Sequence, residues 1–168
     1  MLARMMIRDA RLDDIDAIQT LAVEAEMFTP DEAGFLGAQL RALHAGDPSG
    51  GRWLVVEDAS AALIGSVYYA PEPFSDRMWN LYFIAVAPGQ QRTGLGRRLM
   101  AHVEEALRAQ GEETARTLIV ETSSTPKYER ARAFYRAIGY DEEARIRQFY
   151  GPEDDKVVFW KSLVDAPR

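Results

Sequence analysis

Hydrophobic and polar positions repeat with two different periods along the chain. Short apolar runs rich in β-branched and aromatic residues predict strands at residues 3–9, 52–58, 62–70, 78–86, 116–122, 140–150 and 156–163. Apolar residues spaced three and four apart predict helices at residues 11–22, 30–45, 95–110 and 128–138. The predicted order is one strand, two helices, three strands, a helix, a strand, a helix and two strands.

This order restricts the topology of the sheet. Three successive strands over residues 52–86 without an intervening helix predict an antiparallel meander. The fifth strand follows the fourth through a helix, which predicts that these two strands are parallel. The expected fold class is therefore α/β (α+β), with a mixed, mostly antiparallel sheet of about seven strands.

Two glycines, Gly94 and Gly96, open the helix that follows the fourth strand. The first N–H groups of a helix have no acceptor within it, and the helix dipole adds partial positive charge, so such a turn binds anions. A diphosphate is the expected guest, held by Gln91, Arg92, Thr93, Gly94, Leu95 and Gly96, with the charges of Arg92 and of Arg97 or Arg98. A Gly-x-Gly before a helix is equally often only a tight turn. The stretch has neither the Gly-Lys-Ser/Thr of a P-loop nor the third glycine of a Rossmann fingerprint.

Two segments resemble sequence motifs of one known family. Gln91-Arg92-Thr93-Gly94-Leu95-Gly96 resembles motif A of the GNAT superfamily of N-acetyltransferases, and residues 131–140 resemble its motif B. The resemblance covers nearly the whole chain and implies one GNAT domain over residues 1–168. It also implies helices on both faces of the sheet and strands four and five that splay apart.

The resemblance further implies acetyl-CoA as co-substrate. Its pyrophosphate would lie on the loop at residues 91–97, and its pantetheine would pair with the backbone of Ile84, Ala85 and Val86. Further cofactor contacts are expected from Tyr128, Ala131 and Phe134, and Tyr128 stands where many relatives carry an asparagine.

Acyl transfer to an amine needs a proton acceptor and a proton donor. An alkyl ammonium has a pKa of about 10, so a side chain or a chain of water molecules must take its proton before the nitrogen attacks a thioester. The resemblance implies Glu121 at the end of the fifth strand as this base, and a solvent-facing carboxylate is an equal alternative. It implies Tyr135 as the acid that protonates the leaving thiolate, and a tyrosine of the helix core is the alternative.

Five hydrophobic side chains border the expected acceptor cleft. The set is Met27, Phe28, Phe74, Trp79 and Tyr82, and ordinary packing remains open for each of them. Glu24 and Glu26 could attract a cationic acceptor, although solvated helix residues are the more common reading of such carboxylates.

Composition restricts the class of protein. A chain of 168 residues with 47% hydrophobic and 27% charged residues fits one globular domain, and no segment is long enough to span a membrane. The N-terminal apolar stretch is interrupted by a charge too early for a signal peptide, and the chain contains no cysteine. Both features favour a cytoplasmic protein. A net charge of −6 argues against a nucleic-acid partner. His44 and His102 lack metal-ligand spacing, so no metal is expected.

The resulting hypothesis is an acetyl-CoA-dependent N-acetyltransferase. The acceptor would be a primary amine of a small molecule or of a peptide N-terminus. Direct attack in a ternary complex is expected, because no cysteine is present to form an acyl-enzyme and the resemblance implies a superfamily that generally works without one. The alternatives are a transferase that uses a larger acyl-CoA and an acyl-CoA sensor without turnover. Dimers are frequent in the superfamily, so a homodimer is also considered.

Overall fold

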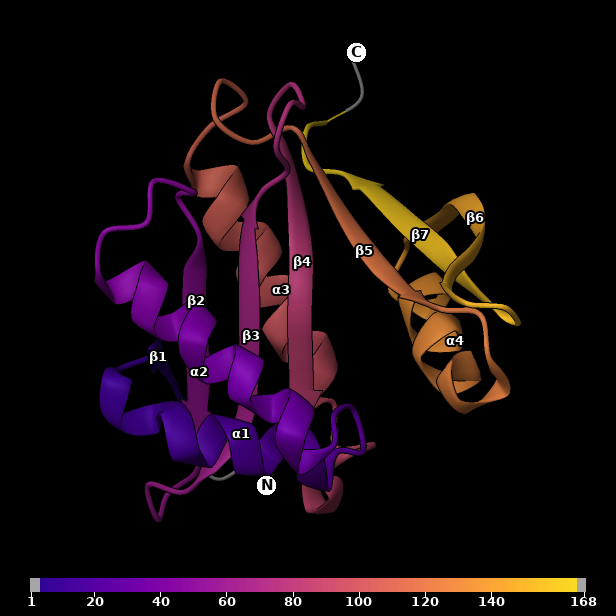
Figure 1. The fold of residues 1–168 in the computed structure, drawn as a ribbon. Coiled ribbons are helices and arrows are strands. Elements are labelled where there is room, and N and C mark those ends of the chain that lie inside the picture. Colours follow the sequence, from indigo (N-terminus) through magenta and orange to yellow (C-terminus); the bar gives the residue numbers. More distant parts are fainter. Residues whose placement is uncertain (1–3, 166–168) are drawn as a thin grey trace. The chain divides into compact units, whose positions relative to one another are not determined.

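A computed structural model describes residues 4–165 of the chain (Figure 1). Its helices are α1 (Ile15–Glu24), α2 (Pro30–His44), α3 (Leu95–Ala109) and α4 (Glu129–Ala137), with short 3-10 turns at Leu12–Asp14, Pro88–Gln90 and Pro126–Tyr128. Its strands are β1 (Met6–Asp9), β2 (Arg52–Glu57), β3 (Leu63–Pro71), β4 (Met78–Val86), β5 (Thr117–Ser123), β6 (Asp141–Gly151) and β7 (Asp154–Ser162). The predicted order of elements is confirmed, and the predicted start of the first strand at Ala3 lies outside the described residues.

The strands form one open, mixed sheet in the order β1-β2-β3-β4-β5-β7-β6. β1 pairs antiparallel with β2, β2 with β3, β5 with β7 and β6 with β7. β4 and β5 are parallel, from Met78 opposite Thr117 to Leu81 opposite Val120. The prediction of a parallel fourth and fifth strand is therefore confirmed.

The chain divides into two compact units. The first unit comprises Met1–Ala70 and Phe83–Met100, and the second comprises Pro71–Tyr82 and Ala101–Arg168. Both β4 and α3 contribute residues to each unit, so the backbone passes between them within regular elements. A single domain over residues 1–168 stays a prediction.

In the first unit, helices cover both faces of the strands. Trp53 and Val55 of β2 belong to a core cluster with residues of α1 and α2, such as Ile18 and Leu40. On the opposite face, a Cβ added to Gly65 of β3 would lie 3.2 Å from Leu99 Cδ1 of α3. Figure 1 shows α1 and α2 in front of β2 and β3, with α3 behind them.

The helix predicted over residues 11–22 is interrupted at its start. Leu12–Asp14 forms a 3-10 turn, and α1 begins only at Ile15. Asp14 accepts hydrogen bonds from the Arg11 backbone N–H at 2.7 Å and from Arg8 Nη1 of β1 at 2.7 Å. The bond from Arg8 holds the pKa of Asp14 below its usual value. This pairing with an earlier strand fixes the turn, and helical spacing alone could not reveal it.

In the second unit, α4 and the end of α3 lie on one face of β7. Tyr135 of α4 packs against Phe159 of β7 with ring centroids 5.4 Å apart. Lys161, two residues further along β7, donates hydrogen bonds to Glu104 Oε2 of α3 at 3.0 Å and to the Ile138 carbonyl at 3.0 Å. Glu104 also accepts a hydrogen bond from the Tyr140 hydroxyl at 2.9 Å. Glu121 of β5 and Lys156 of β7 lie on the opposite face of these two strands. Glu121 is the register partner of Val158, which alternates in direction with Phe159 and shares a face with Lys156.

β6 is an edge strand whose pairing with β7 is irregular. The register shifts between Glu142 and Ala144 and again between Ile146 and Gly151. Within the second irregularity Gln148 has a φ of 56°, and its backbone N–H donates to Asp155 Oδ1 at 2.8 Å. Except for Gly151, every residue of β6 is exposed.

Of the helices in residues 4–165, none combines the length and the apolar character that crossing a bilayer requires.

Candidate active site

The loop between β4 and α3 presents free backbone donors in the first unit. The first hydrogen bond of α3 runs from the Arg98 N–H to the Gly94 carbonyl at 3.0 Å. The N–H groups of Leu95, Gly96 and Arg97 therefore have no acceptor within the helix. The residues before the helix, Gln91–Gly94, are exposed, but the N–H groups of Gln91 and Thr93, predicted as diphosphate donors, donate to the Pro88 and Gln90 carbonyls at 3.4 Å.

The conformation of this loop explains one of its glycines. Gly94 has a φ of 84°, in the left-handed region that glycine adopts without steric cost. Arg92 also has a positive φ, 65°. Thr93 folds back, and its hydroxyl donates to the Gln90 carbonyl at 2.6 Å. The side chains of Arg92 and Arg97 are exposed, so free N–H donors and cationic groups occur in one short stretch. This donor set fits a diphosphate.

The predicted pantetheine-binding strand residues also lie in the first unit. Ala85 is buried in the core cluster, whereas Ile84 and Val86 are partly exposed. Of the predicted acceptor wall, Met27 and Phe28 pack against the same cluster, and Phe28 lies 6.3 Å from Phe83 between ring centroids.

α4 carries the predicted general acid and the remaining cofactor contacts in the second unit. The Tyr135 side chain is buried among Phe134, Tyr140 and Phe159. Burial raises the pKa of the Tyr135 phenol above its ordinary value, so the hydroxyl keeps its proton at neutral pH. Tyr128, Ala131 and Phe134 are partly exposed, and Tyr128 precedes the first residue of the helix.

The predicted base, Glu121, is paired with a lysine. Lys156 Nζ lies 3.0 Å from Glu121 Oε2, and the two side chains are 11% and 24% exposed. The same ammonium group sits 3.4 Å from the centre of the Phe149 ring. Burial raises the pKa of the Tyr150 phenol to about 12, and the negative charge of Glu121 is the second cause of this rise. Glu121 and Tyr135 lie on opposite faces of these strands, because Glu121 is the register partner of Val158 and Tyr135 packs on the neighbouring Phe159.

The other predicted acceptor-wall residues have three different environments in the second unit. Phe74 is fully exposed in the loop after β3. Trp79 is buried, and its indole N–H donates to the Thr114 carbonyl at 3.2 Å. Tyr82 is half-exposed, and its hydroxyl donates to Glu72 Oε2 at 2.8 Å.

Three polar residues near these side chains were missed by the sequence reasoning. Lys156 pairs with Glu121, Glu72 binds Tyr82, and Asn80 is buried in β4 beside Glu72. The sequence could have drawn attention to Asn80, because it is the single amide side chain in the apolar run of residues 78–86. Lys156 opens the run at residues 156–163, and its partner lies 35 positions earlier in the sequence, so local pattern offered no signal.

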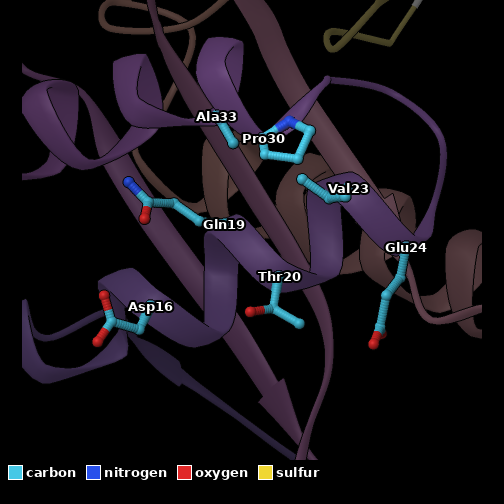
Figure 2. Close-up of a pocket in the computed structure, with 7 residues that line it drawn as sticks. All are labelled: Asp16, Gln19, Thr20, Val23, Glu24, Pro30 and Ala33. Atoms are coloured by element: carbon cyan, nitrogen blue, oxygen red, sulfur yellow. The ribbon is translucent and has the colours of Figure 1, made fainter.

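A pocket on the helical side of the first unit is separate from these residues. Figure 2 shows its lining by α1 and the start of α2, namely Asp16, Gln19, Thr20, Val23, Glu24, Pro30 and Ala33. None of the residues predicted for cofactor binding, catalysis or the acceptor wall belongs to this set. Glu24, considered above as a group that attracts cations, does line it.

Comparisons with known proteins agree with the fold. The model of the acetyltransferase (GNAT) family matches residues 12–140. A crystal structure from Desulfovibrio desulfuricans, described as a GNAT-family acetyltransferase, is 30% identical, covers 96% of this chain and 100% of its own, and has a TM-score of 0.87.

Two more distant structures show the fold alone. The ribosomal-protein-S18-alanine N-acetyltransferase from Escherichia coli is 19% identical, covers 98% of this chain and 97% of its own, and has a TM-score of 0.74. An aminoglycoside 6'-N-acetyltransferase complexed with coenzyme A is 16% identical, covers 97% of this chain and 99% of its own, and has a TM-score of 0.74. A comparison with curated proteins found no match. The family match and the 30% identical structure show that this chain belongs to the GNAT family and is an acetyl-CoA-dependent N-acetyltransferase.

Proposed function

We propose that this protein transfers the acetyl group of acetyl-CoA to a primary amine by direct attack in a ternary complex. The observation that carries the proposal is the start of α3, where free N–H groups and exposed arginines fit a diphosphate. The acceptor is a small-molecule amine or a peptide N-terminus.

The reaction requires two proton movements. The neutral amine nitrogen forms a bond to the thioester carbon, the carbon–sulfur bond breaks, and sulfur leaves with the electron pair. Glu121 takes the proton that the amine nitrogen loses, and the Tyr135 hydroxyl gives its proton to the thiolate. Burial raises the pKa of the Tyr135 phenol, which keeps the hydroxyl protonated and also makes it a weaker acid than an exposed tyrosine. The N–H groups of β4 near Ile84–Val86 polarise the thioester carbonyl.

The function is tested by measuring CoA thiol release from acetyl-CoA with a panel of primary amines, together with calorimetric titration of CoA. Thiol release that depends on an amine supports the proposal. Tight binding of acetyl-CoA without release for any amine would instead identify a sensor. Absence of any binding would reject the assignment of the α3 loop. The same assay with longer acyl-CoA donors decides the acyl preference.

Gly94→Ala should weaken CoA binding by about tenfold. An alanine at a φ of 84° costs roughly 1–2 kcal/mol, and a backbone change that relieves this strain would turn the loop N–H groups away from the diphosphate. Calorimetry of the folded variant measures the change in Kd. Gly89→Ala is the matched control, since a Cβ there would meet nothing within 4 Å and its φ is not positive. Equal affinities for the two variants would contradict the role of this turn.

Glu121→Gln should lower kcat about 10²-fold, at the lower end of the range for loss of a general base, because water can still accept the proton. The deficit should shrink as the pH rises toward the amine pKa of about 10, since more of the amine is then already neutral. A pH series of initial rates checks this. Glu143→Gln on the exposed strand β6 is the control and should leave the rate unchanged. A deficit that is constant with pH would argue against proton abstraction by Glu121.

A further inference from the structure

A polar cluster lies where the loop after β3 meets β4 in the second unit. Glu72 Oε2 accepts hydrogen bonds from Asn80 Nδ2 at 2.9 Å and from the Tyr82 hydroxyl at 2.8 Å. The loop itself is closed by the Glu72 backbone N–H, which donates to the Met78 carbonyl at 2.8 Å. Glu72 is therefore held in place by its backbone and by two side chains.

Asn80 leaves one acceptor unused. The residue is 1% exposed, and within residues 4–165 its Oδ1 accepts no hydrogen bond. The orientation of the amide is fixed, because the Nδ2 end is the only one that can donate to the Glu72 carboxylate. A buried carbonyl without a donor is costly, and proteins rarely keep one without a role. The cluster thus offers a carboxylate and an amide oxygen, both of which are acceptors.

Glu72 also lacks a positive partner. Among the described residues no basic side chain forms an ion pair with it, and the two side chains that donate to its carboxylate are neutral. Arg77 of the same loop and Arg116, which precedes β5, both bind Asp76 at 2.8 Å. Glu121, by contrast, is paired with Lys156. A ligand that brings N–H donors and a positive charge would therefore satisfy Glu72 better than the protein does.

The cluster lies on the same face of the strands as the proposed base. Asn80 is opposite Ile119 in the parallel register, and Ile119 and Glu121 point to the same face of β5 because they are two residues apart. Tyr82 and Glu121 each follow the pair Leu81 and Val120 by one position. Tyr82 is half-exposed, so the cluster reaches the surface on this face.

We propose that Glu72, Asn80 Oδ1 and Tyr82 form a subsite for a second ammonium group of the acceptor. The natural acceptor is then an amine that carries another positive charge away from the reacting nitrogen. This inference rests on the proposed function, in which Glu121 serves the reacting nitrogen. The reacting nitrogen must be neutral when it attacks, whereas the second nitrogen remains an ammonium and can donate to both acceptors.

The test compares amines that differ only in the second charge: putrescine with butylamine, and cadaverine with pentylamine. For the wild type, kcat/KM for the better diamine should exceed that for its monoamine by about 10–100-fold, as expected for hydrogen bonds to a charged group. Glu72→Gln removes the charge and keeps the shape, so it should reduce this ratio to near one. The loss should appear mainly as a higher KM for the diamine, with kcat for the monoamine unchanged.

Two further variants give the controls. Glu105→Gln removes a carboxylate from the exposed side of α3 and should leave the ratio at the wild-type value. Tyr82→Phe removes one hydrogen bond to Glu72 and keeps its charge, so it should reduce the ratio only in part. Thermal unfolding of each variant verifies that it is folded.

The outcomes separate this inference from the function itself. Turnover of amines by the wild type with a diamine ratio near one, or a ratio that Glu72→Gln leaves intact, overturns the subsite. Equal loss of kcat for diamine and monoamine in Glu72→Gln also overturns it, because Glu72 would then act on the reacting nitrogen. Absence of turnover with every amine rejects the proposed function instead.

Discussion

Replacing Tyr135 by phenylalanine is expected to lower kcat by about 10²–10⁴-fold, the range for loss of a positioned proton donor. The substitution removes only the hydroxyl, and the ring can keep its packing against Phe159 and Tyr140. Affinity for CoA should therefore change little. Steady-state CoA release gives kcat, and calorimetric titration with CoA gives the affinity.

The pH dependence of the wild type provides an independent check on Tyr135. Because burial raises the pKa of its phenol, the donor stays protonated from neutral pH through about 10, the usual tyrosine pKa. The rate should therefore not fall over this interval through loss of the donor's proton. Tyr140→Phe is the matched control, since Tyr140 is also buried and its hydroxyl binds Glu104. Equal losses of kcat in both variants would show that packing matters here and proton transfer does not.

Lys161→Met is expected to destabilise the protein by about 3 kcal/mol, at the lower end of the range for breaking a buried ion pair. Glu104 is buried, with its side chain 7% exposed, and Lys161 Nζ contacts both of its carboxylate oxygens. Without the lysine, Glu104 would keep the Tyr140 hydroxyl and a 3.5 Å contact with the more exposed Arg108. These remaining partners place the expected loss at the lower end. Denaturant unfolding at neutral pH measures the free energy of unfolding.

The double variant Glu104→Leu/Lys161→Met distinguishes an unpaired charge from lost packing. Removing both charges replaces a buried ion pair with apolar groups, which is often close to neutral in stability. The double variant should therefore be more stable than Lys161→Met alone. If it is less stable, the stranded carboxylate is not the main cost of Lys161→Met, and the Tyr140 hydroxyl that loses its acceptor in the double variant outweighs it.

Local pattern predicted the elements of this fold well. The strand over residues 78–86 has the same limits in the structure, and the helix after it was placed correctly because Gly94 and Gly111 mark its ends. The last strand begins at Asp154, two residues before the predicted start at residue 156. Asp154 gains a place in the sheet through Gly151, its register partner, and through a hydrogen bond from Ser123 at 2.5 Å. The contact with Ser123 joins residues far apart in the sequence, so composition could not reveal it.

In the candidate site, too, local features could be predicted from the sequence and long-range contacts could not. The turn before α3 could be predicted because it lies in one continuous stretch with two glycines, and its role in binding a diphosphate stays a prediction. The partner of Glu121 could not be predicted, since Lys156 reaches it only through the antiparallel pairing of β5 and β7. The same holds for Glu72 and Asn80, which come together because a loop of the second unit folds back onto β4. The roles of Glu121 and Tyr135 stay predictions until the variants are measured.

The irregular strand β6 also bears on self-association. An outermost strand with a continuous row of free backbone groups would be a template for adding a strand from another molecule, which is the first step of aggregation. Here the row is broken where Gln148 turns its N–H toward Asp155, and the strand itself carries charged side chains such as Arg145 and Arg147. The protein therefore keeps a long outermost strand while offering little uninterrupted backbone for intermolecular β-pairing.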